Sequence, residues 1–198
     1  MTKCLKTAED MEVFKKMPVY DELLAYITTL SDAMAGTKLS EATPAAQSHD
    51  LIKAFMAVFA SIRQLVLSIP LQDMDQQRFG NKAFRVFHEK LQESCDEILQ
   101  PVMNVLRSKN SVSESDTEAL KPYFLDSFGN GTRIDYGTGH ELHFIILTML
   151  SWKLAEPTVS KEHAQQTVSN VIVEYVEVMR HLQSHYRLEP AGRSEERV

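Results

Sequence analysis

The chain is poor in cysteine and has no long hydrophobic run. Its only cysteines, Cys4 and Cys95, form neither a CxxC pair nor a metal-ligand spacing, and this usage favours a reducing setting. No apolar stretch approaches the roughly 18 to 20 residues of a membrane-spanning helix. The first ten residues carry no apolar segment of a secretory signal. We therefore expect a protein of the cytoplasm, with the nucleus as a second location, and no membrane partner.

Positive charge is also scarce. The 198 residues include 21 Lys and Arg against 27 Asp and Glu, which gives a formal net charge of -6. Proteins that bind nucleic acid through its phosphates usually carry a basic stripe, and none is present, so we expect no nucleic-acid partner. A hydrophobic share of 43% is ordinary for a globular protein, and the length suits one domain with a substantial core.

Alternating, strand-type patterns are nearly absent, whereas helical periodicity is strong. Apolar residues recur at i, i+3, i+4 and i+7 over residues 51–66, 84–99 and 168–182. Pro70 and Pro101 are expected to end the first two of these helices. Shorter helices are expected near residues 19–34, 114–126 and 139–154. The sequence thus predicts an all-α fold built as a single multi-helix domain.

Glycine is sparse too, but four of the seven glycines fall within residues 129–139 and surround Arg133 and Asp135. Thr138 and Glu141 stand in the S/T-x-x-E relation of a capping box, which predicts a helix N-terminus at this point. One interpretation is a site where free N–H groups and Arg133 bind a phosphate or carboxylate. The other is a capped helix behind a tight turn, with Arg133 paired to Asp135 or Glu141. No lysine and Ser/Thr follow the glycines, so the segment is not a P-loop.

A second unusual segment begins at Gly80 and Asn81, where turn residues open a strongly periodic helix. Three cations, Arg78, Lys82 and Arg85, fall roughly on one side of that helix. The segment reads either as part of a binding site or as a solvated basic face at a helix start.

The histidines give no recognisable metal motif. His140 and His143 belong to a His-Glu-Leu-His run, but a zincin needs histidines at i and i+4, and position 144 is Phe. His181 and His185 have that spacing without a third ligand in sight. No nucleophile is set beside a base in the sequence. We therefore expect neither a histidine metal site nor a catalytic residue of the nucleophilic type.

Three segments in chain order carry a resemblance to a known family. They are residues 78–85 (Arg-Phe-Gly-Asn-Lys-Ala-Phe-Arg), 132–141 (Thr-Arg-Ile-Asp-Tyr-Gly-Thr-Gly-His-Glu), and 175–180 (Tyr-Val-Glu-Val-Met-Arg) with 186–192 (Tyr-Arg-Leu-Glu-Pro-Ala-Gly). They resemble signature segments of the phosphotyrosyl phosphatase activator family, also called activators of serine/threonine protein phosphatase 2A. The resemblance covers roughly residues 18–192 and is strongest after residue 75.

The resemblance implies an all-α fold in which a core, a linker and a lid surround a deep cleft. It implies a chaperone-like partner of the phosphatase 2A catalytic subunit, held with its scaffold subunit, that uses ATP and magnesium to help that subunit reach its active form. It also implies peptidyl-prolyl cis-trans isomerase activity on a proline-containing peptide, a reaction that requires no nucleophile. By motif position the nucleotide contacts are Arg133, Thr138 and Gly139, and the cleft or phosphatase-facing residues are Gly80, Asn81, Asp135 and Tyr136.

The chain departs from this pattern after Gly192. The family continues into a Val-Trp-Gly-Leu-Asp-Asp segment and further helices, whereas this chain has Arg-Ser-Glu-Glu-Arg-Val at 193–198, which we expect to be a disordered tail behind a helical domain of residues 1–192. The absent part would supply the tryptophan-bearing wall of the peptide groove and the aspartates that hold magnesium. The chain thus resembles a C-terminally truncated member. The alternatives are a non-catalytic phosphatase-binding module and an inactive truncated isoform.

Overall fold

Helices make up nearly all of the regular structure. The computed structural model describes residues 5, 7–39, 43–73, 80–109, 112–156 and 158–191, so Cys4, Arg78, Gly192 and the expected tail lie outside the described residues. Within these residues the helical elements in chain order are α1 (Ala8–Phe14), α2 (Pro18–Met34), the 3-10 turn η2 (Ala45–Gln47), α3 (Asp50–Leu67), α4 (Ala83–Glu93), α5 (Cys95–Arg107), α6 (Glu114–Glu118), α7 (Lys121–Asp126), α8 (Thr138–Ala155), α9 (Lys161–Gln166), the π-helical η3 (Thr167–Ile172) and α10 (Val173–Tyr186). The predicted all-α fold is confirmed.

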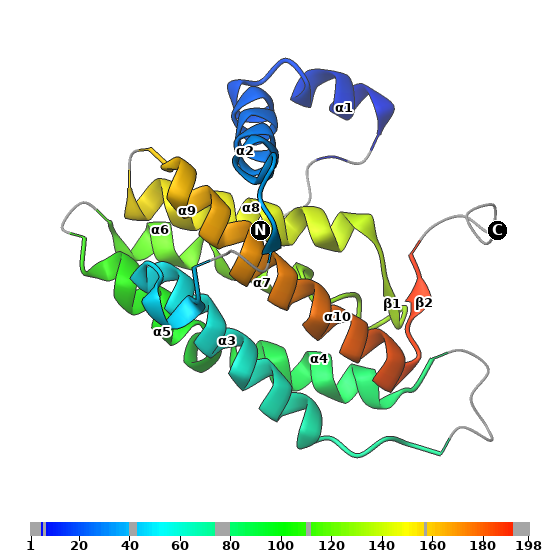
Figure 1. Cartoon of the computed structure of the whole chain (residues 1–198). Helices are drawn as coiled ribbons and strands as arrows, with labels where there is room; N and C mark the ends of the chain where they lie inside the picture. The colour runs from blue at the N-terminus through cyan, green and yellow to red at the C-terminus, as the bar shows by residue number, and fades with distance from the viewer. Residues whose placement is uncertain are drawn as a thin grey trace.

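The hydrophobic core lies between α3, α5, α8 and α10, which cross in the middle of the molecule (Figure 1). Aromatic rings from three of these helices meet there. Phe55 and Phe59 of α3 lie 6.2 and 5.9 Å from the ring of Phe144, which stacks on Tyr175 of α10 at 3.8 Å. All four side chains are buried, and each contributes about 1.5–3 kcal/mol through loss of apolar surface from water. This packing fixes α8 and α10, the two helices whose ends carry the site described below.

Two of the expected helix boundaries are wrong. The chain breaks between α4 and α5 at Ser94, and Pro101 lies inside α5 instead of ending the run. A proline in a helix interior loses one backbone hydrogen bond. Here the helix continues because Ile98 and Leu99 before the proline, and Val102 after it, are all buried against neighbouring helices. Tertiary packing thus outweighs the local preference.

The one sheet in the described residues is a parallel pair of two-residue strands, β1 (Asp135–Tyr136) and β2 (Glu189–Pro190), with Asp135 opposite Glu189. It joins the start of α8 to the end of α10. Figure 1 shows β1 and β2 side by side, next to the C-terminal end of α10. Strands this short leave no alternating pattern in a sequence, so the pair is invisible until the tertiary structure is known.

Helix α1 stands away from the other helices, and α2 leads from it back to the molecule, where it packs on α8 and α9 (Figure 1). The contact includes a buried hydrogen bond in which the Tyr26 hydroxyl donates to Oγ1 of Thr148 at 3.1 Å. Gln165 of α9 also donates its amide to the carbonyl of Ala33 at 2.8 Å. None of the helices in the described ranges is both long and apolar enough to cross a membrane.

Candidate functional site

Three segments that are far apart in the sequence meet at one end of the molecule. The Asn81 N–H donates to the carbonyl of Tyr186 at 2.6 Å, the Glu189 N–H donates to that of Ile134 at 3.0 Å, and the Ala191 N–H donates to that of Tyr136 at 2.7 Å. We call this contact region the junction; it comprises residues 80–82, 129–139 and 186–191. The segments that carried the family resemblance are therefore held against one another by backbone hydrogen bonds.

Two glycines of the junction are required by close approach. Gly80 has a φ of +52°, and a Cβ placed there would lie 2.5 Å from Cγ2 of Ile134 and 3.3 Å from the carbonyl oxygen of Arg187. A Cβ at Gly137 would lie 2.7 Å from the carbonyl oxygen of Ala191. Carbon atoms in contact normally stay at least about 3.5 Å apart, so larger residues at either position would separate the segments.

Ile134 holds an unusual backbone conformation. Its φ is +56°, a left-handed value that is a genuine outlier for a β-branched residue. The conformation is held because its N–H donates to the Asn130 carbonyl at 2.8 Å and its own carbonyl accepts from Glu189, while the side chain is buried against Gly80. Backbone strain of this kind costs about 1–3 kcal/mol and clusters at functional sites. It therefore marks the junction as a candidate site.

Arg133 and Asp135, on either side of Ile134, form a two-pronged ion pair. Nε of Arg133 lies 2.5 Å from Oδ2 of Asp135, and Nη2 lies 3.1 Å from Oδ1. This pairing with Asp135 raises the pKa of Arg133. The Arg133 side chain remains 58% exposed, whereas that of Asp135 is only 12% exposed. The arginine is thus oriented by its buried partner, while more than half of its side chain stays exposed to solvent.

The predicted capping box of Thr138 and Glu141 is wrong. Gly137 is the N-cap of α8, Thr138 is its first residue, and no side chain caps it. The helix begins there because Gly137 continues the extended backbone of β1 and packs on Ala191. The N–H groups at this terminus do not need the capping box to be available to a ligand. The first N–H groups of a helix have no intrahelical acceptor, and Thr138 and Gly139 are both exposed, with open space around Gly139.

Asn81 and Tyr136 are buried at the junction, and their polar groups hydrogen-bond to neighbouring residues. The Asn81 side-chain oxygen accepts from the N–H groups of Gln72 and Ala83 at 3.2 and 2.9 Å, and its amide donates to the Gln72 carbonyl at 2.8 Å. The Tyr136 hydroxyl lies 3.0 Å from that of Tyr175, which donates to a backbone carbonyl. Burial raises the pKa of both tyrosines, so both stay neutral at physiological pH. These buried hydrogen bonds hold the backbone segments of the junction in place.

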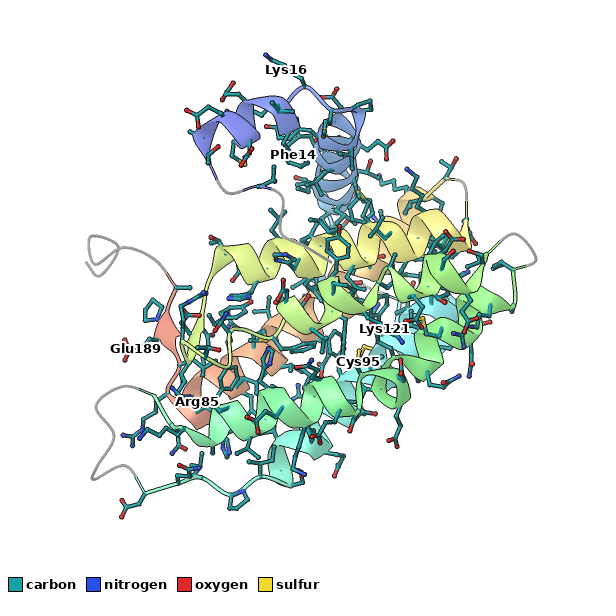
Figure 2. All side chains as sticks on the ribbon, turned by 180° about the vertical axis from the view of Figure 1, so that it is seen from behind. Phe14, Lys16, Arg85, Cys95, Lys121 and Glu189 are labelled. Carbon is teal, nitrogen blue, oxygen red and sulfur yellow. The ribbon has the colours of Figure 1, made fainter. Side chains whose placement is uncertain are left out.

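A surface hollow of about 410 Å³ lies between α4 and residues 129–132 of the junction, which we call the glycine turn. It is lined by Arg85, His88, Glu89, Gln92, Asn130, Gly131 and Thr132. Figure 2 shows Arg85 and Glu189 on the same side of the molecule. An Arg85 N–H donates to the carbonyl of Thr132 at 3.3 Å, which links α4 to the glycine turn. Sequence reasoning singled out Arg85 but missed His88, which is polar and lies on an otherwise apolar helical face.

Of the three cations expected on one side of α4, the structure describes two. Lys82 is the residue from which α4 begins, and Arg85 lies in its first turn. Arg78 lies outside the described residues. The paired histidines of α10, His181 and His185, stack with ring centroids 5.5 Å apart, and the part of the chain that the structure describes brings no third metal ligand to them.

Comparison with known proteins gives consistent matches. Residues 1–195 match the family model described as "Phosphotyrosyl phosphate activator (PTPA) protein". The chain is 31% identical over 191 residues to "Serine/threonine-protein phosphatase 2A activator 2" of Cryptococcus neoformans, an alignment that covers 96% of this chain and 47% of the relative. It is 34% identical over 192 residues to "Probable serine/threonine-protein phosphatase 2A activator 1" of Dictyostelium discoideum, covering 96% and 55% of the two chains.

Among solved structures, the fold resembles the crystal structure of the "PP2A phosphatase activator Ypa1". The TM-score is 0.63 at 28% sequence identity, and the match covers 89% of this chain and 52% of the other. The chain therefore spans about half the length of the relatives it matches.

Proposed function

Because the chain belongs to the phosphotyrosyl phosphatase activator family, we propose that it binds protein phosphatase 2A and takes part in its activation. The observation that carries this proposal is the junction. Segments around Gly80, Ile134 and Glu189 are joined by short backbone hydrogen bonds, and a strained residue lies at their centre. A fold maintains such strain where a surface must be held in one geometry. The names of the relatives point to protein phosphatase 2A as the partner. We propose that the contact is with its catalytic subunit, held with its scaffold subunit.

We further propose that the exposed part of the junction binds the phosphates of ATP. Arg133 offers an oriented guanidinium, and Thr138 and Gly139 offer N–H groups at the start of an 18-residue helix. The dipole of such a helix favours negative charge at this end. A site made of these three residues fits an anion. Asp135 lies beside them, but its carboxylate is engaged by Arg133, so we assign no magnesium ligand in this chain; magnesium would enter bound to the nucleotide phosphates.

Peptidyl-prolyl isomerisation is the finer proposal for activity. Rotation about the peptide bond breaks no covalent bond and faces a barrier of about 18–20 kcal/mol, so a catalyst needs only a surface that favours the twisted amide. The hollow lined by Arg85, His88 and Thr132 is the concave surface that adjoins the junction. We propose it as the place where a proline-containing peptide would bind.

Two substitutions test the nucleotide site. Arg133→Gln removes the charge and the paired N–H groups, and we expect it to weaken binding of ATP with magnesium by about 10-fold or more, the range of a lost charge-assisted contact. Gly139→Ala adds a methyl group to open space in the first turn of α8, so it should keep or slightly raise stability while it blocks close approach of a phosphate. Arg180→Gln, at an exposed arginine of α10, is the matched control and should bind like the unmodified chain. Calorimetric titration measures all three.

Unaltered nucleotide affinity in both Arg133→Gln and Gly139→Ala would refute the nucleotide site. The proposal that the chain binds the phosphatase would be unaffected by that result. That proposal is tested separately, by binding of the chain to the purified catalytic subunit with its scaffold. Binding without a gain in phosphatase or isomerase activity would identify a docking module. Absence of binding would refute the proposed function for this chain.

A further inference from the structure

A second cluster of polar side chains lies at the opposite end of α8 from the junction. Its members are His49, Glu156 and His163, which we call the His–Glu–His cluster. His49 immediately precedes α3, Glu156 immediately follows α8, and His163 lies in the first turn of α9. The length of α8, about 27 Å at 1.5 Å per residue, separates this cluster from Thr138. The cluster is therefore distinct from the proposed nucleotide site.

The carboxylate of Glu156 lies between the two imidazoles. Nε2 of His49 is 3.2 Å from Oε1 of Glu156, and Nδ1 of His163 is 3.1 Å from Oε2. One ligand atom from each residue lies within 4.8 Å of the other two. The three side chains are only 19 to 29% exposed. The buried ring of Trp152 stacks on His163 at a centroid distance of 4.9 Å. Three ligand-type groups thus converge on one partly enclosed point.

One of these atoms has no hydrogen-bond partner. Nδ1 of His163 is buried and makes no hydrogen bond, although Oε2 of Glu156 lies 3.1 Å away. A buried polar atom left without a partner costs about 1–3 kcal/mol, so its persistence needs a reason. A buried ring nitrogen that faces a carboxylate, with a second imidazole ring centred 4.8 Å away, is placed as a metal ligand would be.

We propose that the His–Glu–His cluster binds a divalent transition-metal ion, with zinc preferred. Two imidazole nitrogens and one carboxylate oxygen are a ligand set that zinc and iron(II) accept, with further positions left to water. Magnesium and calcium prefer oxygen ligands and are disfavoured here. A bound ion would draw the donor atoms together and would link the start of α3, the end of α8 and the start of α9.

Binding would change the hydrogen bonding of His49. Its Nδ1 accepts from the Leu51 N–H at 3.1 Å and caps α3, so in the neutral ring the proton sits on Nε2, facing Glu156. A metal at Nε2 requires that proton on Nδ1 instead, and the cap bond to Leu51 is then lost. Zinc binding is thereby coupled to the first turn of α3.

The test is a titration of the full chain with zinc chloride against a chromogenic chelator at about pH 7.5, well above the ordinary pKa of a free imidazole. We expect one zinc per chain. Glu156→Gln and His163→Gln should each weaken binding by more than about 10-fold, since even an outer-shell partner of a metal ligand is worth 10- to 100-fold. His49→Ser removes the nitrogen but keeps a helix-capping oxygen, so the fold is preserved while the affinity falls. Magnesium should not displace the zinc.

The matched control is His181→Gln, which replaces an exposed histidine of α10 that stacks on His185 and should leave zinc affinity unchanged. Zinc should also shift the amide resonance of Leu51, a signal that a merely structural cluster would not give. Zinc affinity that survives Glu156→Gln, or that falls equally in His181→Gln, would overturn the proposal. If a variant proves unstable, the Leu51 resonance in the unmodified chain decides alone, and no shift on adding zinc refutes the site.

Discussion

Replacing Gly80 with alanine adds one methyl group where the first and second junction segments already touch. The new carbon would lie 2.5 Å from Cγ2 of Ile134, well inside van der Waals contact. Crowding of this kind costs about 1–3 kcal/mol, and an L-residue at a φ of +52° costs a further 1–2 kcal/mol or so. The stiffer unfolded chain returns up to about 1 kcal/mol. We expect Gly80→Ala to lower the free energy of unfolding by about 1–4 kcal/mol.

Gly36→Ala separates the two causes. Gly36 also has a positive φ, +74°, but a Cβ there meets nothing within 4 Å, so only the conformational cost remains, about 1 kcal/mol or less after the same correction. Urea denaturation measures both variants, with the midpoint compared at constant slope. Equal losses in the two variants would refute the claim that Gly80 is required by its contact with Ile134. In that refuting case, a double-mutant cycle of Gly80→Ala with Ile134→Ala would show no coupling energy between the two positions.

Two further predictions concern other parts of the molecule. Thr167→Val removes the hydroxyl that accepts a hydrogen bond from the buried Trp152 Nε1 at 2.8 Å, and should lower the free energy of unfolding by about 1–3 kcal/mol in urea denaturation followed by tryptophan fluorescence. Thr29→Val, at an exposed hydroxyl, is the control and should change that free energy by less than about 0.5 kcal/mol. Similar losses in the two variants would contradict a stabilising role for the Trp152–Thr167 hydrogen bond. Burial lowers the pKa of His88 below 6.5, so the unfolded chain binds its proton more readily and the stabilisation, present above pH 6.5, is lost as the pH falls further. His88→Gln should therefore flatten the fall in unfolding free energy between about pH 7 and pH 5, and an unchanged slope would exclude this cause.

Most of the helices could be predicted because their signal is local. The buried face of α3 repeats every three to four residues, and Pro70 follows its end as expected. Pro101 misled because a proline reports a local preference, whereas the burial of Ile98 and Val102 on either side of it is decided by helices far away in the sequence. The break at Ser94 has no sequence signal that we can identify.

The candidate site was predicted in its residues more than in its geometry. The glycine cluster marked a segment that the structure places in the junction, and the pairing of Arg133 with Asp135 belongs to one of the two arrangements that the sequence left open. The Thr138–Glu141 pattern failed because the same residue types fit a helix that begins one residue earlier, and only the contact of Gly137 with Ala191 decides between them. The nucleotide roles stay predictions.

The His–Glu–His cluster could not be found from spacing. His49 is more than a hundred residues away from Glu156 and His163, so no short motif joins them, and the pair with motif spacing, His181 and His185, finds no third ligand among the described residues. The expectation that no metal binds through histidine rested on local patterns alone. It is open to test at the cluster, where the tertiary fold supplies what the sequence separates.

The strain at Ile134 has a physical reason that follows from its neighbours. Glycine or asparagine at this position would adopt the same backbone at much lower cost, because neither carries a β-branched side chain. Isoleucine is nevertheless there, buried to 5% exposure with its Cγ2 against the backbone of Gly80. The side chain therefore sets the separation between two junction segments, and the left-handed backbone turns Arg133 and Asp135 to the positions in which they pair. The backbone conformation of Ile134 therefore sets the direction of Arg133, an exposed arginine a few residues before α8.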